Sequence, residues 1–93
     1  MIKSFKCKET AEIWDIGYSR RFPADIMKRA VIKLAMLNRS ATLHDLSVPP
    51  SNHLEKLSGN REGQFSIRIN DQFRVCFRWT DNGAEDVEIV DYH

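Results

Sequence analysis

Apolar residues in the first half of the chain recur at the spacing of an α-helix. The longest such series is Ile26, Ala30, Leu34 and Leu37. Residues three or four apart share one side of a helix, so the series predicts a long helix from Pro23, which a first turn tolerates, to about residue 38. A shorter apolar side predicts a second helix over Glu9–Ile16, which Gly17 ends. Ser40 is expected to cap one further turn.

The pattern changes to a period of two in the second half of the chain. Apolar residues alternate with polar ones in two runs, first Phe65, Ile67 and Ile69, and then Phe73, Val75, Phe77 and Trp79. Such alternation is typical of strands with one buried face. A turn follows each run, and a final strand over residues 85–90 directs Val87 and Ile89 to the core. Ile2–Phe5 is expected to form a short first strand.

These elements predict a single α+β domain over residues 1–93, in which an N-terminal strand and two main helices pack on a small, mostly antiparallel sheet. A chain of 93 residues with 42% hydrophobic and 29% charged content is large enough for one modest core. No apolar run approaches the length of a membrane span, and the first residues lack the apolar stretch of a signal peptide. We therefore expect a cytoplasmic protein without a membrane partner.

The cysteine content gives no indication of a disulfide framework or a metal centre. Cys7 and Cys76 are the two cysteines, and the sequence has neither a CxxC motif nor a Cys/His cluster. Two reduced thiols are the expectation, with no metal and no cofactor.

The polar face of the predicted sheet gathers several basic side chains. Its residues are the arginines Arg68, Arg74 and Arg78, together with Tyr92 near the end of the chain. If this face is open, the guanidinium groups present forks of donors that match the paired oxygens of a phosphate. The alternative for Arg68 and Arg78 is cross-strand pairing with Glu88 or Asp86.

Several segments together resemble the HigB-like toxins of bacterial type II toxin–antitoxin systems, within the RelE/ParE superfamily. They are Met1–Phe5, Leu54–Gly63, Ser66–Phe77 and Asp91–His93. The resemblance covers essentially the whole chain and implies the RelE-like toxin fold. It implies a ribosome-dependent endoribonuclease that cuts messenger RNA in the A site of the small ribosomal subunit and so inhibits translation. It also implies a cognate HigA-like helix-turn-helix antitoxin that holds the toxin inactive.

By position, the resemblance assigns the catalytic residues. Arg74 matches the arginine that stabilises the scissile phosphate, and Tyr92 and His93 match the terminal pair at the cleavage site. Glu55 stands where some HigB toxins have histidine, and Ser58 where they have lysine, whereas a YoeB-like branch uses glutamate as the base. The residues expected to bind RNA are Lys56, Arg61, Arg68, Arg78 and Asp91.

The chemistry of RNA cleavage requires groups of the same kinds. RNA supplies its own nucleophile, the 2′-hydroxyl, so an enzyme needs a base, a cation beside the phosphorane and an acid for the leaving 5′-oxygen, without a metal. Glu55 is the expected base, Arg74 the cation and His93 the acid. Tyr92 is expected to stack on a nucleobase. His53 and His93 stay open as alternative bases.

Two other functions stay open at this point. One is a ParE-like toxin that inhibits a topoisomerase and cuts nothing, and the other is a non-catalytic RNA-binding module. A ParE-like toxin would not need the predicted base, cation, acid and stacking residue together, so their presence in one chain favours the nuclease.

Overall fold

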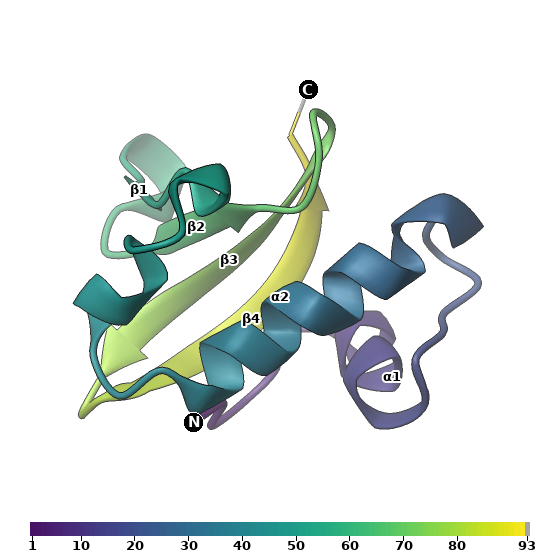
Figure 1. The fold of residues 1–93 in the computed structure, drawn as a ribbon, viewed down its shortest axis with the longest axis horizontal. Helices are drawn as coiled ribbons and strands as arrows, with labels where there is room; N and C mark the ends of the chain where they lie inside the picture. Colours follow the sequence, from purple (N-terminus) through teal and green to yellow (C-terminus); the bar gives the residue numbers. More distant parts are fainter. Residues whose placement is uncertain (93) are drawn as a thin grey trace.

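A computed structural model describes residues 1–92 and shows an α+β fold. Its main elements are α1 (Lys8–Ile16), α2 (Met27–Arg39), β1 (Glu55–Lys56), β2 (Phe65–Arg68), β3 (Phe73–Thr80) and β4 (Gly83–Asp91). The strands form one antiparallel sheet in the order β1-β2-β3-β4. Both helices lie on the same side of this sheet, with α2 running across it (Figure 1). The predicted fold class is confirmed.

The first helix, α1, ends for the reason that the sequence suggested. Gly17 adopts a left-handed conformation with φ +79°, and its backbone N–H donates to Ile13 at 2.9 Å to close α1. Before α2, a 3₁₀ turn over Ala24–Ile26 follows Pro23, so the α-helix proper begins only at Met27. The predicted apolar series faces the core: its residues are buried against the sheet.

The expected capping role of Ser40 is wrong. Ser40 ends α2, and its hydroxyl donates to the carbonyl of Met36 at 2.8 Å. The next turn is capped by Thr42, whose side chain accepts from the backbone N–H of Asp45 at 3.3 Å while the Asp45 carboxylate accepts from the backbone N–H of Thr42 at 3.0 Å. These backbone donors, that of Thr42 first and then that of Ala41, lower the pKa of Asp45.

The N-terminal segment joins the sheet at two points rather than as a full strand. Ile2 and Phe5 form isolated parallel bridges with Ala84 and Val87 on the outer edge of β4. Between these bridges, β4 leaves the regular strand conformation at Asp86, which has φ +53°. The pairing of β3 with β4 shifts register in the same region. A continuous ladder with the N-terminal segment is interrupted by this bulge.

The sequence had suggested that the face of the sheet pointing away from the helices is open. In the structure this face is covered. Ser66, Arg74 and Cys76 on this face are all buried. No periodic pattern predicted β1, which adds a short hairpin beside β2 through the pairs Glu55–Ser66 and Lys56–Phe65. Leu57, two residues beyond Glu55 and therefore on the same face, is buried outside the main core. The segment around β1 thus gives this face a covering of its own.

Candidate active site

Arg74 lies at the centre of the covered face, in the middle of the sheet. Its side chain extends from β3, and the whole residue is only 8% exposed. The Nε atom donates to the hydroxyl of Ser66 on β2 at 2.8 Å, and Nη2 donates to the backbone carbonyl of His53. Hydrogen bonds from a charged donor are strong where water is excluded. The guanidinium is therefore fixed from two sides, by the sheet and by the segment before β1.

One end of this guanidinium reaches the surface. Among residues 1–92, no group accepts a hydrogen bond from Nη1 of Arg74. No buried side-chain nitrogen or oxygen in the described chain lacks a hydrogen-bond partner, so Nη1 has contact with solvent. The guanidinium of Arg74 is thus anchored through Nε and Nη2, while Nη1 offers a free pair of N–H donors.

Glu55 places a carboxylate beside this arginine. Oε1 of Glu55 lies 3.3 Å from Nη2 of Arg74, and the Glu55 side chain is about half exposed. Antiparallel pairing of β1 with β2 sets Glu55 opposite Ser66, the residue that also holds Nε of Arg74. The pairing of a strand of two residues therefore decides where this carboxylate lies.

Tyr92 completes the group from the end of the chain. The guanidinium carbon of Arg74 lies 5.7 Å from the centre of the Tyr92 ring, within the range of a cation–π contact. The backbone N–H of Tyr92 donates to the carbonyl of Gln72 at 2.6 Å, and the side-chain amide of Gln72 donates to Asp91 at 3.0 Å. The turn between β2 and β3 therefore holds the chain end in place. Sequence reasoning missed Gln72, Ser66 and the His53 carbonyl, because their part in the site depends on contacts across strands.

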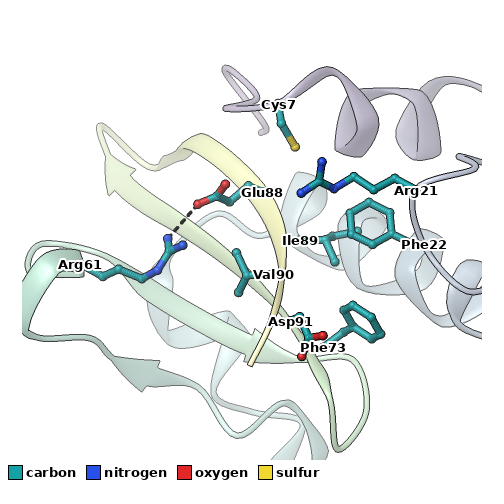
Figure 2. A pocket seen from close by; sticks show the side chains of 9 residues that line it. All are labelled: Cys7, Arg21, Phe22, Arg61, Phe73, Glu88, Ile89, Val90 and Asp91. Atoms are coloured by element: carbon teal, nitrogen blue, oxygen red, sulfur yellow. Dashed lines mark hydrogen bonds and ion pairs between the residues drawn. The ribbon is translucent and has the colours of Figure 1, made fainter. Parts of the chain in front are cut away.

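Two of the predicted RNA-binding residues line a pocket beside β4 rather than surrounding Arg74. Arg61 and Asp91 both line this pocket, which has a volume of about 580 Å³ (Figure 2). Arg61 points from the segment before β2 toward Glu88 and pairs with it at 2.8 Å. That hydrogen bond raises the pKa of Arg61 above its ordinary value. Arg21 extends into the pocket from the opposite side, next to the ring of Phe22.

The other predicted RNA-binding residues are dispersed. Lys56 is exposed next to Glu55. Arg68 pairs with Asp71 in the turn after β2, and it lines a second pocket, against α2. Arg78 pairs with Asp86 at 3.6 Å, which is the cross-strand alternative that the sequence had left open. Arg78 thus takes the paired alternative, Arg68 pairs within its own turn, and Arg74 is buried.

The histidines contribute less to the described site than the arginines. The residue His53 is exposed, and its backbone is left-handed with φ 44°. His44 is exposed and lies 3.3 Å from the Ser47 hydroxyl through Nδ1. His93, the predicted acid, lies outside the described residues. Within residues 1–92, no group of three His, Cys, Asp or Glu side chains is placed to hold a metal ion, and no helix has the length and apolarity needed to cross a membrane.

Comparison with known proteins identifies the family. A family model described as RelE-like toxin of type II toxin-antitoxin system HigB matches residues 3–93. The chain belongs to this family. The HigB-like toxin is 40% identical over 85 residues to Toxin HigB-1 of Vibrio cholerae serotype O1, across 90% of both chains. It is 29% identical over 93 residues to Endoribonuclease HigB of Proteus vulgaris, across 100% of both chains.

Solved structures of other proteins share the fold. The HigB-like toxin matches a chain of the YoeB-YefM complex from Staphylococcus aureus with a TM-score of 0.62 and 20% identity, over 100% of this chain and 98% of that one. It matches a YafQ mutant from E. coli with a TM-score of 0.64 and 11% identity, over 98% and 93% of the two chains. At such identities, the likeness supports the architecture alone.

Proposed function

We propose that this HigB-like toxin is an endoribonuclease that cuts messenger RNA without a metal ion, and that the whole chain acts as one toxin domain in the cytoplasm. The observation that carries the proposal is the convergence of Glu55 from β1, Arg74 from β3 and Tyr92 from the chain end on one point. The name of the Proteus vulgaris relative, Endoribonuclease HigB, supports the same activity.

The proposed reaction uses the 2′-hydroxyl of the substrate as nucleophile. Glu55 removes its proton, the 2′-oxygen attacks the adjacent phosphorus, and the bond from phosphorus to the 5′-oxygen breaks. His93 gives a proton to that oxygen, so that the products are a 2′,3′-cyclic phosphate and a 5′-hydroxyl. Arg74 stabilises the negative charge that builds up on the phosphorane.

The contacts of Arg74 suit this role. The Ser66 and His53 contacts use Nε and Nη2, whereas Nη1 reaches solvent. A phosphate can therefore bind to Nη1 without breaking the contacts that orient the side chain. A preorganised donor of this kind needs no rearrangement during the reaction, which is the condition under which electrostatic stabilisation is most effective. Glu55, held 3.3 Å from Nη2, is then next to the bound phosphate.

Tyr92 is proposed to bind a nucleobase at the cleavage site. The residue is 43% exposed, and one side of its ring lies against the Arg74 guanidinium. A half-exposed aromatic ring of this kind offers a stacking surface to an unpaired base. Lys56, exposed beside the proposed base, and Arg61 and Asp91 in the β4 pocket are proposed as further RNA contacts.

The proposed setting is the ribosomal A site. The formal net charge of the protein is only +1, and affinity for free RNA depends mainly on the number of phosphates that a protein neutralises. The ribosome is therefore proposed to position the message for this toxin. A HigA-like helix-turn-helix antitoxin is the proposed cognate partner, a proposal supported by the toxin–antitoxin family of the chain.

Ribosome dependence is tested with one labelled message, presented either free or on programmed ribosomes. We expect cleavage on the ribosome and little cleavage of the free RNA at the same toxin concentration. Equal cleavage in the two samples would contradict the ribosomal part of the proposal. No cleavage in either sample would instead favour a ParE-like toxin or a non-catalytic RNA-binding module.

The proposed base is tested with Glu55→Gln, which keeps the shape of the side chain and removes its basicity. We expect the single-turnover rate on programmed ribosomes to fall by about 10²-fold, within the range for loss of a general base. The matched control is Glu62→Gln, because Glu62 is an exposed glutamate in the loop that follows β1. If the two variants cut at the same rate, Glu55 is not the base, and His53 or His93 takes its place.

A further inference from the structure

A second pocket lies between α2 and the end of β2, outside the Arg74 centre. This helix–sheet pocket has a volume of about 290 Å³ and is lined by Arg29, Ile32, Lys33, Ser51, Arg68 and Ile69. Its charged lining residues are three cations, and none of its lining residues is an acid. A pocket that collects cations without carboxylates in its wall suits an anionic ligand.

The cations of the helix–sheet pocket are held near one another by contacts with the backbone and with a buried amide. Nζ of Lys33 donates to the side chain of Asn52, which is fully buried, and Nη1 of Arg29 donates to the carbonyl of Ile69 at 3.5 Å. The pKa of Lys33 lies below its ordinary value, first because of burial and then because of the charges of Arg29 and Arg68. A bound anion would relieve this repulsion.

Among residues 1–92, the one acidic side chain that pairs with these cations is weakly placed. Arg68 pairs with Asp71, whose side chain is 99% exposed. Exposed ion pairs contribute little free energy, so a phosphate of a bound ligand can displace this carboxylate. The guanidinium forks of Arg29 and Arg68 match phosphate oxygens in pairs.

The helix–sheet pocket adjoins the Arg74 centre through two connections. Arg68 and Arg74 are directly opposite each other in β2 and β3, and residues opposite each other in an antiparallel pair have Cα atoms about 4.5–5.5 Å apart. The short segment 51–53 separates the two sites: Ser51 lines the pocket, and the carbonyl of His53 accepts from Arg74. The pocket and the Arg74 centre therefore share the segment 51–53 and a pair of opposed residues in β2 and β3.

We propose that the helix–sheet pocket binds a second phosphate of the RNA strand that is cut at Arg74. The proposal rests on the proposed function for the identity of that strand. The adjacency to Arg74 favours RNA over an acidic segment of the antitoxin, since two neighbouring anion sites fit a ligand with repeated phosphates. Substrate affinity then depends on cations of α2 that do not take part in the reaction.

The test uses a fluorescent 2′-O-methyl oligoribonucleotide, which lacks the attacking hydroxyl and cannot be cut. The variant Arg29→Gln/Arg68→Gln removes two pocket charges and keeps Lys33, which holds Asn52. The matched control Lys28→Gln/Arg39→Gln removes two exposed charges from the same helix, outside the pocket. Thermal melting of each variant checks that it is folded.

We expect the pocket variant to bind the oligonucleotide about tenfold more weakly than the control. We also expect the slope of log affinity against log salt to become shallower by about 0.7, the value for one phosphate of a single strand. Equal losses in both variants would overturn the inference. So would a pocket variant with unchanged oligonucleotide binding and weakened antitoxin binding, which would assign the pocket to the antitoxin.

Cleavage assays on programmed ribosomes separate this inference from the proposed function. If the pocket binds a substrate phosphate, the pocket variant shows a higher KM with little change in kcat. If the wild-type protein cuts no RNA, the proposed function fails, whereas the oligonucleotide measurement still decides whether the pocket binds phosphate.

Discussion

Replacement of Arg74 by lysine is the most informative perturbation of the proposed site. Lysine keeps the positive charge but has a single ammonium group in place of the planar fork. It cannot hold the Ser66 hydroxyl and the His53 carbonyl and also present a free pair of donors, as the guanidinium does. Arg74→Lys therefore separates the presence of a charge from its orientation.

The expected magnitude follows from these contacts. Loss of a preorganised donor to the developing charge costs about 10²–10³ in rate, or about 3–4 kcal/mol. The single-turnover rate of Arg74→Lys on programmed ribosomes should fall by that factor. The rate of Arg74→Ala should fall at least as far. This variant should also be less stable, because Arg74 is buried and binds both β2 and the segment before β1. Loss of two charge-assisted hydrogen bonds lowers the free energy of unfolding by about 3 kcal/mol.

Urea denaturation and single-turnover cleavage measure the two effects separately. The matched control is Arg39→Lys, since Arg39 is an exposed arginine at the end of α2. Rates are compared only under conditions where each variant is folded. A rate for Arg74→Lys within threefold of wild type would refute the argument that the oriented fork stabilises the phosphorane. An unchanged free energy of unfolding for Arg74→Ala would refute the anchoring role of its contacts.

Three further predictions address the stacking ring, a helix cap and a turn that contains a glycine with positive φ. Tyr92→Phe should keep most of the cleavage rate while Tyr92→Ala loses about tenfold, because the ring rather than the hydroxyl contacts Arg74; equal losses in single-turnover assays would point to the hydroxyl. The pKa of Asp45 is lowered in the fold, so the stabilising effect of its carboxylate is present above the unfolded pKa of about 3.9 and is lost as the pH falls. Asp45→Asn should therefore melt at a lower temperature than wild type at pH 7, and this difference should narrow below about pH 4. A difference that does not change with pH would contradict the linkage. Gly63 has φ +88°, so Gly63→Ala should destabilise the fold by about 1 kcal/mol in urea titrations, whereas a neutral result would mean that the turn relaxes.

Local patterns in the sequence determined most of the secondary structure. The apolar series on α2 and the alternation in β2 and β3 predicted those elements, because helix and strand periodicities depend on neighbouring residues alone. Gly17 ended α1 as expected, since few other residues adopt a left-handed conformation without strain. The resemblance to HigB-like toxins pointed to the family that the match over residues 3–93 identifies.

The tertiary structure alone decided what surrounds Arg74. β1 has two residues and no periodic pattern of its own, so only its pairing with β2 shows that Glu55 lies beside Arg74. The same hairpin covers a face that the alternation had suggested was open. Periodicity tells which side of a strand a residue occupies, but burial depends on segments distant in the chain that pack over that side. For this reason the resemblance in sequence could point to Arg74 as a site residue, whereas only the fold shows that its side chain is anchored and nearly buried.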